Sequence, residues 1–161
     1  MIKSQTRRDE GFTLIELLVT ISLLGVMMAI AVSGWSSWSQ ARAQSGAARE
    51  LLSVMRQAQQ RAVTEGRPTC VAFTTGQSSS YSVVAGVCGT AGAVTQGLPG
   101  RVRLASASFV KPSTTAPQTA VQFSSRGTGW PGSVTVQRTG SSTVYTLQVE
   151  VLTGHVALQQ T

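Results

Sequence analysis

The pattern of hydrophobic and polar positions predicts a membrane segment at the start of the chain. Residues 1–11 are polar and include three basic side chains, whereas residues 12–34 are almost entirely apolar apart from Glu16 and several small residues. About 20 apolar residues in a helix span the ~30 Å hydrocarbon layer of a bilayer. We therefore predict one membrane-spanning helix over residues 12–34. The basic residues before it favour the cytoplasmic side, which places the rest of the chain outside.

A helical pattern continues beyond the membrane segment. No proline occurs between Ala41 and Glu65, and the sequence 66–68, Gly-Arg-Pro, is a strong stop signal. At ~100° per residue, one face of this stretch is apolar and the opposite face is basic. The apolar face carries Leu51, Met55, Ala58 and Ala62, and the basic face carries Arg42, Arg49 and Arg56. We predict an amphipathic helix over residues 35–65 that lays its apolar face on a β-sheet.

The remaining residues, 66–161, have the pattern of short antiparallel strands. Segments that alternate or are rich in β-branched residues are separated by Gly, Ser and Pro. We predict strands at residues 69–75, 80–85, 102–105, 120–124, 133–138, 144–152 and 155–158, and loops at 86–100 and 111–119. The predicted fold class is α+β, with a long N-terminal helix packed on a small antiparallel β-sheet domain.

Composition and cysteine content narrow the chemistry. The chain has 161 residues, of which 42% are hydrophobic and only 12% charged, with a net charge of +7. Its two cysteines, Cys70 and Cys88, lie in the part predicted to face outside, where an oxidising compartment favours a disulfide. Two buried free thiols are the alternative. Two cysteines and one histidine do not predict a metal site, and no pattern in the sequence indicates a cofactor.

Glu16 is the residue in the membrane segment that most requires an explanation. A carboxylate inside a membrane helix is costly and needs a partner of opposite charge. Cleavage after Gly11 would create a free ammonium group at Phe12, four residues before Glu16. In a helical filament, Glu16 of one subunit can pair with that ammonium group on a neighbour. The alternative is a carboxylate near the interface that reaches water.

These residues resemble a known processing motif. The sequence Gly-Phe-Thr-Leu-Ile-Glu-Leu-Leu at 11–18 resembles the prepilin cleavage and methylation motif of type IV pilins and type II secretion pseudopilins. The resemblance implies that a membrane prepilin peptidase cuts after Gly11 and methylates Phe12, and that Glu16 is the assembly carboxylate. Residues 41–73 and the turn Phe-Ser-Ser-Arg-Gly at 123–127 resemble the GspH/FimT family. The chain is similar to that family over nearly its whole length.

The resemblance implies a structural role. We expect a cleaved leader at residues 1–11, a helix at 12–65 and an extracytoplasmic domain at 66–161, anchored in the inner (cytoplasmic) membrane. The expected function is that of a minor pseudopilin in a type II secretion pseudopilus, which supports protein secretion. Its expected partners are prepilin peptidase, the membrane, and other pilins or pseudopilins contacted through the N-terminal helix. No catalytic set is expected, because His155 is the single histidine and no carboxylate pair is apparent.

Two other functions stay open at this point. The first is a minor type IV pilin, acting in pilus assembly or in DNA binding during natural transformation. Its basis is Arg101 and Arg103, two residues apart on a predicted strand, where they can contact phosphate groups. The favoured interpretation of these arginines is a basic face exposed to solvent. DNA binding is the second interpretation, and contact with an acidic protein partner is the third. The second function is a membrane-tethered binding module that never polymerises.

Overall fold

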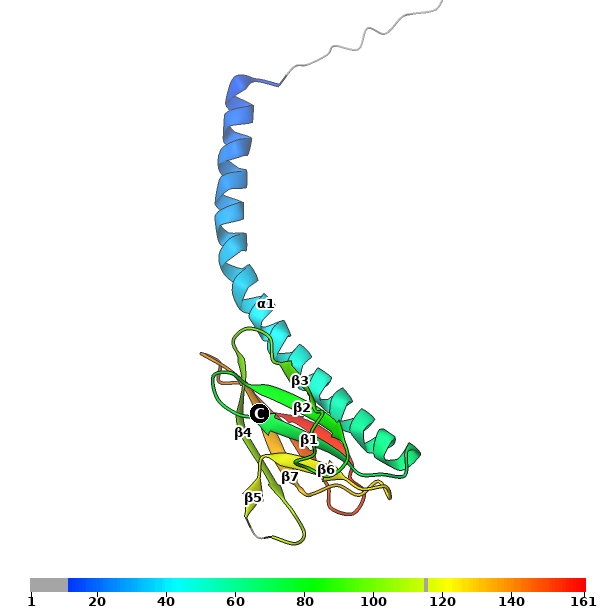
Figure 1. Ribbon diagram of the computed structural model, residues 1–161. Helices are drawn as coiled ribbons and strands as arrows, with labels where there is room; N and C mark the ends of the chain where they lie inside the picture. Colours follow the sequence, from blue (N-terminus) through cyan, green and yellow to red (C-terminus); the bar gives the residue numbers. More distant parts are fainter. Residues whose placement is uncertain (1–11, 115) are drawn as a thin grey trace, which may run out of the picture. The chain divides into compact units, whose positions relative to one another are not determined.

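The computed structural model describes residues 12–114 and 116–161, so the predicted leader and Gly11 lie outside the described residues. Within this part of the chain there is one helix, α1 (Leu14–Thr64), followed by β-strands (Figure 1). The chain forms two compact units, Met1–Ser39 and Gln40–Thr161. The second half of α1 therefore belongs to the same unit as the strands. The helix ends before Gly66, whose φ of +65° is a left-handed conformation that suits glycine and stops the helix.

The strands form two antiparallel sheets. They are β1 (Thr69–Thr74), β2 (Ser80–Ala85), β3 (Val94–Gly97), β4 (Val102–Val110), β5 (Pro117–Gln118), β6 (Ala120–Phe123), β7 (Gly132–Arg138), β8 (Val144–Val149) and β9 (Val156–Gln160). One sheet has the order β3-β2-β1-β6, and the other has the order β5-β4-β7-β8-β9. The predicted fold class, a long helix followed by an antiparallel β-domain, is confirmed. The division of the strands into two sheets was not predicted.

Some strand boundaries differ from the sequence prediction. The strands β3 and β5 lie within stretches predicted to be loops. All four residues of β3 are exposed, so no buried side chains mark this strand in the sequence; backbone pairing with β2 holds it. Strand β8 ends at Val149 rather than at residue 152, because Glu150 N–H donates to the His155 carbonyl and starts a turn. Val151, which lies within the predicted strand, is exposed in that turn.

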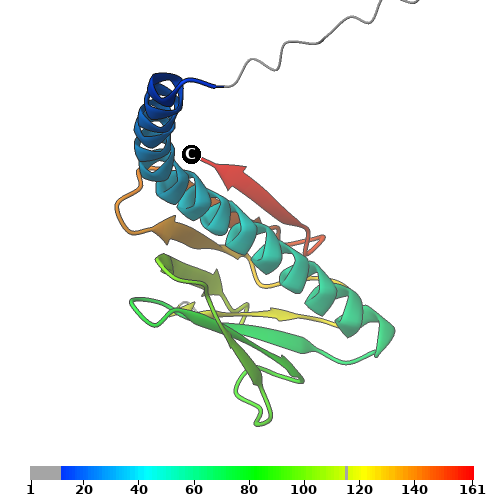
Figure 2. The same cartoon turned by 90° about the horizontal axis from the view of Figure 1, so that it is seen from above.

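The core lies between the second half of α1 and both sheets (Figure 2). The predicted apolar face of the helix is buried as expected, from Ala47 to Ala62. Alanines on this face allow the helix to approach the sheets closely, and Leu51 and Met55 fill the space between them. From the strands, the largest fully buried side chains are Phe109, Phe123, Leu104 and Leu147. Phe109 also stacks on Phe73, with 5.6 Å between the ring centroids, and so links the two sheets.

The disulfide and one glutamine fix loops to this framework. Cys70 on β1 is bonded to Cys88 in the loop that follows β2. Near the C-terminal end of α1, the Gln59 side-chain amide donates to the carbonyls of Gly127 (2.7 Å) and Thr153 (2.8 Å). These two carbonyls belong to different turns, so one helical side chain holds both in place. Gly154 packs into the same junction.

We predict that Gly154→Ala destabilises the protein much more than Gly140→Ala. Both glycines have positive φ, +61° and +79°, so both substitutions strain the backbone. A Cβ at Gly154 would lie 2.2 Å from the Gly127 carbonyl oxygen, whereas a Cβ at Gly140 meets nothing within 4 Å. The additional loss of unfolding free energy should be about 1–3 kcal/mol, the range for overpacking. Urea denaturation of the detergent-solubilised protein measures it, and equal losses in the two variants would contradict the packing at this junction.

Candidate assembly helix and basic surface

The start of α1 is capped by a threonine. The backbone N–H of Glu16 donates to Thr13 Oγ1 at 3.3 Å and to the Thr13 carbonyl at 3.1 Å. Thr13 thus satisfies a donor that the first turn of a helix otherwise leaves unpaired. Glu16 lies in this first turn, where a negative charge is favoured by the helix dipole. Phe12 precedes the cap and is 85% exposed.

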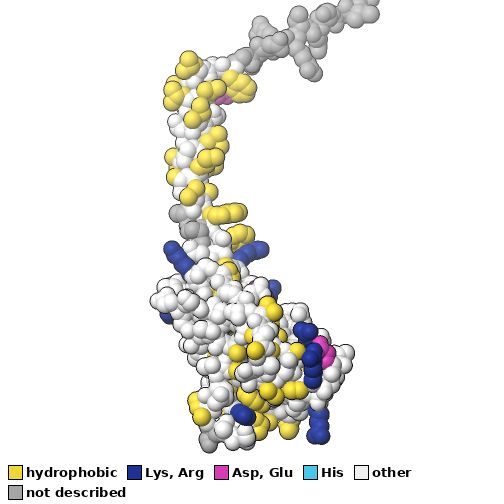
Figure 3. Space-filling view, viewed as in Figure 1, with side chains coloured by type: hydrophobic (Ala, Val, Ile, Leu, Met, Phe, Trp, Pro, Cys, Tyr) yellow, Lys and Arg dark blue, Asp and Glu magenta, His cyan; other side chains and the backbone are white. Residues whose placement is uncertain are grey.

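The first half of α1 presents a continuous apolar surface. The segment Leu14–Val32 has 19 residues with a mean hydropathy of 2.4, and none of it is buried within the structure. Its large hydrophobic side chains are 50–81% exposed, and Figure 3 shows them along this part of the helix. The hydroxyls of Thr20 and Ser22 donate to helix carbonyls one turn back, at 2.9 and 2.8 Å. The segment is therefore suited to lipid or to the apolar helices of other subunits.

Glu16 is the exception on this apolar surface. Its side chain is exposed, and among the described residues its carboxylate has no hydrogen bond or ion pair. A carboxylate in hydrocarbon without a partner is costly. In hydrocarbon, such a carboxylate would need a partner from outside the described residues of this chain.

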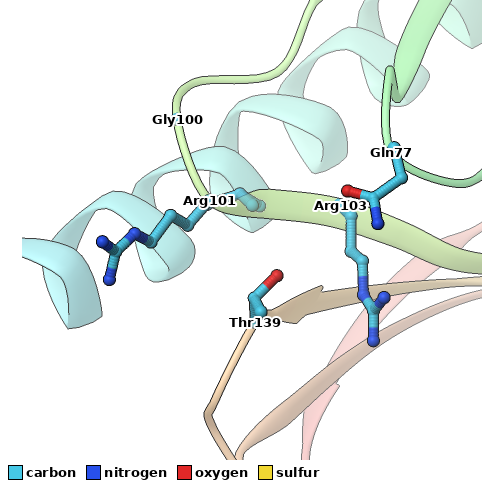
Figure 4. Close-up of a pocket in the computed structure, with 6 residues that line it drawn as sticks. Gln77, Gly100, Arg101, Arg103 and Thr139 are labelled. Carbon is cyan, nitrogen blue, oxygen red and sulfur yellow. The ribbon is translucent and has the colours of Figure 1, made fainter.

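The arginines predicted as a phosphate contact do not lie on one strand face. Strand β4 begins at Val102, so Arg101 belongs to the preceding turn and Arg103 to the strand. They line a surface pocket of about 240 Å³ together with Gln77 and Thr139. Figure 4 shows that the Arg101 and Arg103 side chains point in different directions. The Nε atom of Arg103 is buried and has no hydrogen-bond partner in the described part of the chain. The pocket is therefore basic, but the two arginine side chains are not arranged to bind one phosphate group together.

Sequence reasoning missed two glutamines that fasten α1 to the second sheet. Gln40 accepts a hydrogen bond from Arg138 Nη1 at 2.9 Å. Gln44 is only 2% exposed, and its amide donates to the Thr143 carbonyl at 2.9 Å. The helical periodicity contained a signal for Gln44, because it precedes Ala48 and Leu51 on the buried face by one and two turns.

A buried tyrosine joins α1 to the first sheet. Tyr81 on β2 is 5% exposed, and its hydroxyl donates to Glu50 Oε1 on α1 at 2.8 Å. The side-chain amide of Gln96 on β3 lies 3.3 Å from the same hydroxyl. Burial, and secondly the hydrogen bond to Glu50, raise the pKa of Tyr81 to about 12. The contact therefore holds edge strand β3 and strand β2 against the helix.

The end of α1 has a mixed charge. Glu65 accepts hydrogen bonds from the guanidinium groups of Arg61 and Arg67, which hold the pKa of its carboxyl below its ordinary value. Figure 3 shows acidic side chains (magenta) next to basic ones (dark blue) on the β-domain unit. His155 is exposed beside β9, and in the described part of the chain no three His, Cys, Asp or Glu side chains gather as a metal-binding group.

The exposed apolar half-helix, followed by a helix half packed on antiparallel sheets, defines a type IV pilin-like structural subunit, anchored in a membrane. The chain belongs to the GspH family, described as type II transport protein GspH, whose model matches residues 47–153. Residues 6–32 match the prokaryotic N-terminal methylation motif. The predicted family is thus confirmed.

Solved structures also contain this fold. The type IV minor pilin FimU of Pseudomonas aeruginosa (strain PAO1) is similar with a TM-score of 0.53 and 15% sequence identity. The similarity covers 71% of this chain and 91% of the FimU chain. At this identity the similarity concerns the fold. No curated protein sequence matched the chain.

We predict that the Tyr81 contact makes the protein lose stability at alkaline pH. Between pH 10, the ordinary pKa of tyrosine, and about 12, the unfolded chain releases the Tyr81 proton while the folded chain keeps it. Stability therefore falls as the pH rises through this window. Urea unfolding of the wild type and of Tyr81→Phe, followed from about pH 9 to 12, should show the stability advantage of the wild type shrinking. An advantage that stays constant would contradict the assignment.

Proposed function

We propose that this protein is a minor pseudopilin of a type II secretion system, a structural subunit that supports protein secretion. The observation that carries this proposal is the exposed carboxylate of Glu16 on an otherwise unbroken apolar helix surface. The family description, type II transport protein GspH, supports secretion as the process. Association with other pilins or pseudopilins through α1 follows from the same surface.

Processing is the first step of the proposed function. The methylation motif over residues 6–32 supports cleavage by a prepilin peptidase after Gly11 and methylation of the new N-terminus at Phe12. The precursor would be a single-pass protein of the inner membrane, with its C-terminal domain extracytoplasmic. Basic residues in the leader favour this orientation.

Assembly is the second step, and electrostatics would guide it. Phe12 precedes Glu16 by four positions, which corresponds to ~6 Å along a helix axis if the helix extends to Phe12. A neighbour displaced along the filament can place its Phe12 ammonium group against the Glu16 carboxylate. In hydrocarbon this pairing removes the cost of two isolated charges and selects one register between subunits.

We predict that Glu16→Gln is processed normally and stays in the membrane but is lost from sheared filaments. The substitution keeps the size of the side chain while removing the charge that the neighbour's ammonium group needs. Incorporation should fall at least about tenfold, as expected for losing roughly 1.4 kcal/mol or more per contact. Immunoblots of sheared filament fractions measure it, and mass spectrometry locates the N-terminus.

Glu150→Gln is the matched control, because it removes an exposed carboxylate from the β8–β9 turn rather than from the apolar helix. It should enter filaments as the wild type does. Normal incorporation of Glu16→Gln, or an N-terminus other than Phe12 in assembled protein, would overturn the proposed assembly mechanism.

The alternative function is that of a minor type IV pilin, acting in pilus assembly or DNA binding. Arg101 and Arg103 support it, since they make one surface pocket basic. Their divergence favours separate contacts over a joint grip on one phosphate group. We therefore rank secretion first and keep DNA as the less favoured partner.

We predict that deletion of the gene abolishes release of secreted enzymes into the medium, because a pseudopilus lacking a subunit fails to push substrates outward. Pilus-dependent DNA uptake should continue. Both activities are measured in the same deletion strain, and restoration by the wild-type gene is the control. Normal secretion with lost DNA uptake would reverse the order of the two functions.

A further inference from the structure

The charges of the compact unit Gln40–Thr161 are unevenly distributed. This unit contains ten Lys and Arg residues but three Glu residues. Each Glu has a local role away from the start of the unit. Glu50 accepts the Tyr81 hydrogen bond, Glu65 pairs with two arginines around the end of α1, and Glu150 lies in the turn that Gln59 fastens.

At the start of the unit, around Gln40, the charged side chains among the described residues are all basic. Arg138 bonds directly to Gln40, and Val102 is its cross-strand partner on β4. The Thr139 N–H donates to the Arg101 carbonyl at 3.1 Å, which brings the turn before β4 to the same place. We call Arg42, Arg101, Arg103 and Arg138 the basic end of this unit.

Three arginines of the basic end, Arg101, Arg103 and Arg138, can offer donors to an anionic partner. The Arg101 side chain is exposed and makes no hydrogen bond or ion pair within the described part of the chain. Arg103 and Arg138 are half-buried, and because their Nε atoms are buried, the Nη groups are the donors that they can offer to a partner at the surface. A guanidinium group offers five N–H donors, so each of these two arginines has donors left for acceptor oxygens.

The chain itself keeps the basic end near a membrane. Gln40 follows Val32, the last residue of the apolar segment, by eight residues of continuous helix. At the rise of an α-helix this is at most ~12 Å along the chain. The headgroup layer occupies roughly the first 5–7 Å of that distance, and the Debye length is ~8–10 Å at physiological salt. By chain length alone, Gln40 and the Arg138 side chain bonded to it therefore come within electrostatic reach of lipid phosphates.

We propose that the basic end binds the headgroups of anionic phospholipids in the membrane that anchors α1. Each arginine near an anionic membrane surface contributes about 1 kcal/mol, so several together hold the domain against the bilayer reversibly. Lipid is favoured over DNA because the anchored helix keeps lipid headgroups permanently within range, whereas DNA has to arrive by diffusion. The proposal requires a membrane anchor and is independent of whether the protein serves secretion or a pilus.

The test measures lipid selectivity of the full chain in proteoliposomes. Spin-labelled phosphatidylglycerol and phosphatidylcholine are compared by electron paramagnetic resonance, and the motionally restricted fractions give the ratio of their association constants. The wild type should prefer phosphatidylglycerol, and high salt should weaken this preference. Arg101→Gln/Arg103→Gln should reduce the preference at least about fivefold, the effect expected from the loss of even one full contact between an arginine and the anionic surface.

Arg61→Gln/Arg67→Gln is the matched control, because it changes the net charge equally at the mixed-charge end of α1. It should keep the preference of the wild type. Circular dichroism checks the fold of each variant, and Arg101→Gln alone, at an exposed side chain, serves if the double variant unfolds. Equal selectivity in wild type and basic-end variants would overturn the proposal. So would a loss of duplex DNA binding in those variants with unchanged lipid selectivity.

Discussion

One helix has to satisfy two different surroundings along a single run of backbone hydrogen bonds, and the rest of the structure depends on this constraint. From Leu14 to Val32, α1 turns apolar side chains outward in every direction, and its hydroxyls bond back to its own carbonyls. From Gln40 onward, the same helix buries a face that includes Leu51 and Met55 and exposes its arginines. The first half is stable only when lipid or other subunits cover it, whereas the second half carries the core of its own domain.

The sequence predicted those parts of the fold that burial makes periodic. The helix, its buried face, and strands such as β2 and β7 have patterns that follow from side chains facing a core. Strand β3 was not predicted because all its residues are exposed, so no pattern of buried side chains marks it in the sequence. The strand predicted at residues 144–152 was too long. Val151 continues the alternation of apolar and polar residues, although the backbone has already entered the turn after β8. Periodicity reports burial; it does not report where hydrogen bonds close a turn.

The candidate functional residues also divide into those that the sequence predicted and those that only the structure revealed. Glu16 was identified from sequence because a charge in an apolar run conflicts with its surroundings, and that conflict is visible without coordinates. The basic end was not identified, since its arginines come from α1, the turn before β4, β4 itself and β7, and are separated by as many as 96 positions, from Arg42 to Arg138. Strand pairing between Val102 and Arg138, together with the contact to Gln40, brings them together. The prediction that Arg101 and Arg103 act as a pair relied on spacing alone, and the turn before β4 separates their directions.

Glu16 and the basic end would act in opposite dielectric surroundings, and this difference determines which contact dominates during assembly. Arginines at a hydrated membrane surface contribute about 1 kcal/mol each and are screened by salt, so a subunit can leave the surface readily. A carboxylate and an ammonium group paired in hydrocarbon attract one another far more strongly, and separating them exposes two uncompensated charges. A subunit held at the bilayer by its arginines is therefore retained before assembly but not trapped there. In the proposed assembly, once Glu16 meets a neighbour's Phe12, the stronger contact would keep the subunit in the filament.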